Sequence, residues 1–189
     1  MKIILSLSFI LSFAFATAEV EEVFIGWNAF KCQNNCLELI ETNFSKIEDK
    51  TQLKINAAAG QAEMQWNPNK PFSYEPFRSA AAAVGITIRE MRLRVKGTIE
   101  HDLDSFYLIS TTDHTRFKLI APIQTESGRY TPRYNLSNHY FSNEEKKHLL
   151  NLENQQKTVI VSGLLYLPAS YTNILIAEKI KPHKRVSDN

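Results

Sequence analysis

The sequence predicts an α+β protein in which two helices cover a four-stranded sheet and a small five-stranded β-barrel with one helix follows. Three observations predict this class. Segments that alternate apolar and polar residues are interleaved with segments of helical spacing in the first half. Five apolar strand segments and a single helix make up the second half. With 43% hydrophobic and 22% charged residues, the 189-residue chain can build a sizeable core.

The first half begins with a strand that runs directly into a helix. Alternation from Val23 to Trp27 predicts the strand. The helix is predicted by apolar residues at helical spacing, namely Cys36, Leu37, Ile40, Phe44 and Ile47. A hairpin follows, because residues 53–57 and 62–66 each alternate and Gly60 permits a tight reversal between them.

The second helix and a last strand complete the first half. Ser73 is expected to cap the helix, Pro76 is tolerable in its first turn and Gly85 ends it. The strand then continues through residues 86–91. The order strand, helix, strand, strand, helix, strand predicts a ferredoxin-like βαββαβ sandwich over residues 19–90.

Residues 91–181 predict the barrel. Its strands are expected at residues 91–99, 106–109, 117–120, 158–165 and 174–177, with a helix over 142–154 between the third and the fourth. Gly97 lies where the first strand must bend, and Ser142 is expected to cap the helix. Three strands, a helix and two strands resemble an OB-fold barrel. Residues 182–189 form a polar tail.

An export signal is predicted at the start of the sequence. Met1 to Ala18 contains one charged residue, Lys2, then an apolar run and the small-residue ending Ala16-Thr17-Ala18. The apolar run is shorter than the roughly 20 residues that span a bilayer. We therefore expect cleavage after Ala18, no membrane span in the mature chain, and a periplasmic or secreted product in an oxidising compartment.

The chain has only two cysteines, Cys32 and Cys36, and they lie between the first strand and the first helix. This junction, with the hairpin and the second helix, resembles the heavy-metal-associated domain of copper chaperones, metal-pumping ATPases and periplasmic mercury-binding proteins. The resemblance covers residues 20–89. It implies that Cys32 and Cys36 bind a soft ion such as Cu(I), which is exchanged with a metal-donor or metal-acceptor protein.

Two features of the junction depart from that family. Phe30 stands where the family has Met, and three residues separate the cysteines instead of two. Two thiolates still suit a soft cation, and a helix N-terminus favours thiolate formation. The alternatives are a local Cys32–Cys36 disulfide, in a metal-free adaptor or structural protein, and a Cys36 that packs on the apolar face of the helix.

Other function classes find less support. The net charge of +2 offers no broad basic face, so nucleic acid is not an expected partner, even beside the basic and aromatic residues of 129–141. His101-Asp102 and Asp113-His114 lie at predicted turns, and His139 and His148 are expected on the surface. No catalytic motif is present, so we expect no enzyme activity. The sequence thus predicts an exported metal carrier or sensor whose OB-like barrel serves as a docking module.

Overall fold

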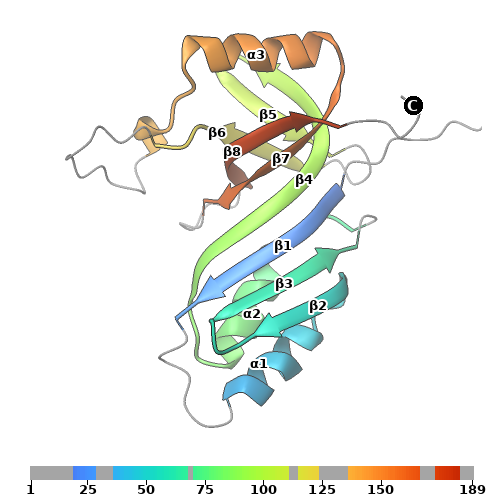
Figure 1. Cartoon of the computed structure of the whole chain (residues 1–189), viewed down its shortest axis with the longest axis vertical. Coiled ribbons are helices and arrows are strands. Elements are labelled where there is room, and N and C mark those ends of the chain that lie inside the picture. Colours follow the sequence, from blue (N-terminus) through green and yellow to red (C-terminus); the bar gives the residue numbers. More distant parts are fainter. Residues whose placement is uncertain are drawn as a thin grey trace, which may run out of the picture.

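A computed structural model describes residues 19–28, 36–67, 70–110, 115–123, 136–166 and 173–183. Eight strands and three α-helices lie in these residues, and all eight strands belong to one sheet (Figure 1). The predicted signal, residues 1–18, falls outside the described residues, and so do the last residues of the polar tail, 184–189.

The first part of the chain supplies four strands and two helices. Their bounds are β1 Glu19–Trp27, α1 Cys36–Ser45, β2 Lys50–Asn56, β3 Gln61–Trp66, α2 Glu75–Ala83 and β4 Ile88–Asp102. The strands lie in the order β2-β3-β1-β4, and each neighbouring pair is antiparallel. The side chains of β3 alternate between exposed and buried, as expected for a sheet with one face on a core.

The second part closes into a barrel. Its elements are β5 Ser105–Ile109, β6 Arg116–Ile120, the short 3₁₀ helix η2 Leu136–Asn138, α3 Asn143–Asn154, β7 Thr158–Leu165 and β8 Ile174–Pro182. From β4 the pairing runs through β5, β6, β8 and β7 and returns to β4, with β6 and β8 parallel. This closed five-stranded barrel with one helix is compatible with the barrel component of the sequence prediction.

β4 belongs to both parts of the sheet. Its first residues, from Ile88 to Lys96, pair with β1, and those from Thr98 onward pair with β5. Residues Arg92–Thr98 also pair with β7. Figure 1 shows β4 as one long, curved strand that runs from the helix-covered sheet into the barrel. The predicted boundary between residues 90 and 91 falls inside this strand.

The predicted fold class, a ferredoxin-like α+β sandwich followed by a barrel, is wrong. Of the described residues, 48% are in strands. These strands form one continuous sheet, whereas the prediction was a separate sandwich followed in the sequence by a barrel. The larger of two hydrophobic clusters also contains buried side chains of both parts, and in it the rings of Phe72 and Phe117 lie 6.0 Å apart. Periodicity identifies single elements, but it does not show that one strand serves both parts.

The helix α3 begins as the sequence predicted. The Ser142 hydroxyl accepts a hydrogen bond from the Glu145 amide at 3.3 Å, and the Glu145 carboxylate accepts one from the Ser142 amide at 2.7 Å. These reciprocal bonds form a capping box. Leu149 and Leu152 are buried on the inner side of the helix, so α3 covers one end of the barrel (Figure 1).

Candidate functional site

The predicted metal ligands belong to the connection between β1 and α1. β1 ends at Trp27, and the backbone of Cys36 begins α1. Cys32 and the side chain of Cys36 lie outside the described part of the structure. The structure therefore describes the two ends of the cysteine segment and does not place the two thiols.

Both ends of this segment are fixed to the core. The Trp27 amide donates a hydrogen bond to the Gly60 carbonyl at 2.8 Å, which ties the end of β1 to the β2–β3 turn. The Trp27 ring is buried and packs against Phe44 of α1, with 6.0 Å between the ring centroids. Ile40, one turn earlier in α1, is also fully buried. The described residues on both sides of the cysteine segment thus pack into the core.

A small pocket of about 290 Å³ lies at the same end of β1. Its described lining comes from the end of β1, the β2–β3 turn and the start of β4: Gly26, Trp27, Ala59, Gly60, Gln61, Arg89 and Glu90. Gly26 leaves room for Glu90, because a Cβ atom at Gly26 would lie 2.9 Å from the Glu90 Cγ. The buried Trp27 Nε1 has no hydrogen-bond partner among the described residues.

This pocket was not predicted from the sequence. Arg89 and Glu90 lie on the last strand of the first half, far from the cysteines in the sequence, and only the β1–β4 pairing brings Glu90 beside Gly26. The signal that could have indicated it was a glycine at the end of a strand, where a close approach of another chain segment is common. No group of three or more His, Cys, Asp or Glu side chains within the described ranges is arranged to hold a metal ion.

The histidines do not assemble into a site in the described structure. His139, expected on the surface, is in fact buried, with its Nδ1 2.7 Å from the Ala121 carbonyl oxygen and its ring against Tyr166. His139 is buried because it packs beside the end of β6, a contact between distant residues that the sequence does not indicate. His148 is exposed, as expected.

His101 and Asp102, which were predicted at a turn, are instead the last two residues of β4, and the turn follows at residues 103–104. The His101 amide donates a hydrogen bond to the Glu153 carboxylate at 2.8 Å. The His101 ring packs against the Phe106 ring, with 4.8 Å between the ring centroids. The Asp102 carboxylate lies 3.7 Å from the Arg116 guanidinium. These contacts join the β4–β5 hairpin to α3 and β6. Asp113 and His114 lie outside the described residues.

A second pocket, of about 350 Å³, lies between α3 and β8. Its lining combines apolar and acidic side chains with one histidine: Phe141, Glu144, Glu145, His148, Leu149, Ala177, Glu178 and Ile180. Two of the carboxylates already have partners. Glu145 belongs to the capping box, and Glu178 forms an ion pair with Arg92 at 2.5 Å. Glu145 and Glu178 therefore serve the fold at this pocket.

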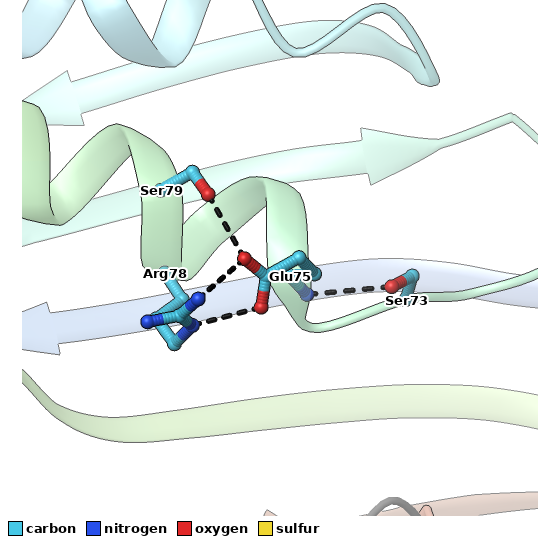
Figure 2. Close-up of polar contacts among 4 residues, drawn as sticks. All are labelled: Ser73, Glu75, Arg78 and Ser79. Atoms are coloured by element: carbon cyan, nitrogen blue, oxygen red, sulfur yellow. Dashed lines mark hydrogen bonds and ion pairs between the residues drawn. The ribbon is translucent and has the colours of Figure 1, made fainter.

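A network of side-chain hydrogen bonds lies at the start of α2 (Figure 2). The Arg78 guanidinium donates two hydrogen bonds to Glu75, at 2.8 and 2.6 Å, and the Ser79 hydroxyl donates a third at 3.1 Å. The Ser73 hydroxyl accepts from the Glu75 amide at 3.3 Å. Ser73 was predicted as the cap, but Tyr74 holds that position. All these contacts involve Glu75 at the N-terminal end of α2. The Glu75 carboxylate stabilises this helix end, because a negative charge there complements the helix dipole.

The Arg78 hydrogen bonds lower the pKa of Glu75 below its ordinary value of 4.5, and the Ser79 hydrogen bond contributes to the same shift. A lowered pKa means that this contact stabilises the fold above about pH 4.5 and that the gain is lost as the pH falls through the folded-state pKa. We expect an NMR titration to place the Glu75 midpoint below 4.5. Arg78→Ala should raise the midpoint, and Ser79→Ala should raise it by less. An unchanged midpoint in Arg78→Ala would contradict this assignment.

No protein-family model matches this chain, and the comparison with curated proteins finds no match. Among the helices of the described ranges, none has the length and apolar character needed to cross a membrane.

Proposed function

We propose that this protein is an exported carrier or sensor of a soft metal ion, which it binds with Cys32 and Cys36. One observation carries the proposal. The two cysteines, four positions apart, occupy the end of a connection between β1 and α1 that the core anchors on both sides, at Trp27 and at Ile40 and Phe44. Anchored ends of the connection would lower the entropic cost of binding one ion between the two thiols.

The chemistry of the two thiols fits a soft ion. Thiolate ligands select Cu(I) and similar cations over hard cations such as Mg²⁺ and Ca²⁺. α1 begins at Cys36, and the unpaired amide groups of a helix N-terminus carry partial positive charge that favours the thiolate over the thiol. The resemblance of the cysteine junction to heavy-metal-associated domains supports the same ion class.

Export is proposed from the signal-like sequence of residues 1–18, which lie outside the described residues. The proposed cleavage after Ala18 falls immediately before β1, whose first residue is Glu19. Removal of the signal would therefore leave every described element intact. In the mature protein the barrel would act as the docking module toward a metal-donor or metal-acceptor protein.

The proposal predicts one Cu(I) per mature chain. We would titrate the reduced protein with Cu(I) in competition with a chromophoric Cu(I) chelator and follow the chelator absorbance. Wild type should withdraw one equivalent of Cu(I), and the Cys32→Ser, Cys36→Ser double variant should withdraw none. Leu39→Ser is the control, because Leu39 is an exposed residue of α1 and is not a thiol. Ca²⁺ and Mg²⁺ should not compete.

Equal Cu(I) uptake by wild type and the double variant would contradict the proposal. Alkylation of protein purified without reductant, followed by mass spectrometry, distinguishes a metal carrier from a metal-free adaptor. Two free thiols are expected for a metal carrier, whereas a Cys32–Cys36 disulfide that is not reduced under mild conditions would favour a metal-free adaptor.

A further inference from the structure

Three lysines lie together on the outer wall of the barrel, where β4, β7 and β8 are side by side (Figure 1). Lys181 of β8 lies opposite Ile160 of β7, and Ile160 lies opposite Lys96 of β4. Directly opposed residues point to the same face of a sheet. Val161, the neighbour of Ile160, is fully buried, so the lysines face outward. Lys179, two residues before Lys181, shares this face, and we call Lys96, Lys179 and Lys181 the lysine patch.

The positive charge of the lysine patch is greatest along β8. Within the described part of the chain, none of the three lysines forms an ion pair. Acidic residues lie on the β1 side of β4, where Glu21 is 2.7 Å from Arg94 and Glu19 is the register partner of Lys96. Glu178, beside the patch on β8, is held in an ion pair by an arginine of β4. The two exposed lysines of β8 therefore keep their charge available to a partner.

We propose that the lysine patch docks an extended acidic segment of a partner protein, with carboxylates at alternate positions of that segment. Lys179 and Lys181 are two residues apart on a strand, so their Cα atoms are separated by about 7 Å. Alternate residues of an extended partner segment have the same separation and point to one face. Two carboxylates of such a segment can therefore meet the two ammonium groups of β8 at once.

The side chains between the lysines favour a protein segment over a nucleic acid. Ile160 lies between Lys96 and Lys181, and Ser162 lies opposite Lys179. An apolar side chain of a peptide can cover the half-buried Ile160. Proteins that bind single-stranded nucleic acids instead place aromatic side chains beside the basic groups, so that bases can stack on them. The described residues of these two cross-strand rows include no aromatic side chain.

The lysine patch and the cysteine connection lie at opposite ends of β1. Lys96 pairs with Glu19, the first residue of β1, whereas the connection to α1 follows its last residue, Trp27. The inference gives the docking role of the barrel a partner class, and in that respect it rests on the proposed function. Its test uses no metal, so a negative result would leave the Cu(I) titration as a separate test.

Binding of a fluorescent, capped peptide in which Glu alternates with Ser would test the proposal. Fluorescence anisotropy at low ionic strength should show that the mature protein binds this peptide. The double variant Lys179→Gln, Lys181→Gln should raise the dissociation constant by about two- to thirtyfold, the range expected for the loss of two exposed ion pairs. Added salt should weaken binding by the wild type, because exposed charges are screened.

The double variant Lys46→Gln, Lys54→Gln is the matched control. Both lysines are exposed and belong to the helix-covered part, and their replacement removes the same charge. The dissociation constant of this variant should stay close to that of the wild type. Equal losses of affinity in the two double variants would overturn the proposal, because binding would then follow net charge. Absence of peptide binding by the wild type, or tighter binding of an oligothymidylate of equal charge, would also overturn it.

Discussion

Replacement of Phe72 by alanine should lower the free energy of unfolding by about 3 to 5 kcal/mol, the usual cost of removing a buried phenylalanine ring. Phe72 precedes α2 and is 5% exposed. Its ring lies 5.6 Å from Trp66, 5.9 Å from Phe77 and 6.0 Å from Phe117 of β6. The ring therefore joins the helix-covered sheet to the barrel.

Urea denaturation followed by tryptophan fluorescence and by circular dichroism would measure this effect. Because the two parts share β4 and this aromatic contact, both signals of the wild type should change in one transition. Tyr140→Ala is the control, because Tyr140 is 64% exposed. The urea midpoint of this variant should stay close to that of the wild type. Two separate transitions in the wild type would show that the parts unfold independently, contrary to this expectation.

Replacement of Gly163 by alanine should lower the free energy of unfolding by about 1 to 3 kcal/mol or more, which is the usual cost of adding atoms to a well-packed site. Gly163 lies in β7, where the pairing with β8 shifts register. A Cβ atom there would lie 1.9 Å from the Ile176 carbonyl oxygen, so the backbone of β8 would have to move. Thermal unfolding should show a lower melting temperature for Gly163→Ala than for the wild type.

Gly26→Ala is the matched comparison for Gly163. A Cβ atom at Gly26 would meet the Glu90 side chain, 2.9 Å from its Cγ, and that flexible side chain can move. We expect a clearly smaller fall in melting temperature. An equal fall in melting temperature in the two variants would show that the close contact with the β8 backbone does not determine the destabilisation in Gly163→Ala.

Much of the secondary structure could be predicted because its signals are local. Ser142 indicated the start of α3, and the alternation of Ala62, Met64 and Trp66 indicated β3. Gly97 was predicted at a bend of β4, and a Cβ atom there would lie 2.5 Å from the Ile109 carbonyl oxygen. The predicted cap of α2 was one residue too early: the Ser73 hydroxyl accepts a hydrogen bond from the Glu75 amide, but Tyr74 is the N-cap. Helix boundaries commonly vary by one or two residues.

The candidate site could be predicted only in part. Two cysteines at a strand-to-helix junction are visible in the sequence, and the structure confirms that β1 precedes this junction and that α1 begins at Cys36. The pocket beside Trp27 was missed, because Glu90 comes close to Gly26 only through the pairing of β1 with β4. The burial of His139 was missed for the same reason, since its partners Ala121 and Tyr166 are distant in sequence.

The sequence by itself determined the type and order of the helices and strands, because hydrophobic periodicity, caps and turn residues act over a few neighbouring positions. Only the tertiary structure decided that β4 serves both the open sheet and the barrel, that Phe72 and Phe117 join one core, and that β2 keeps a free edge. These features arise from contacts between residues far apart in the chain. Each such contact depends on pairing partners and register, which no local pattern specifies.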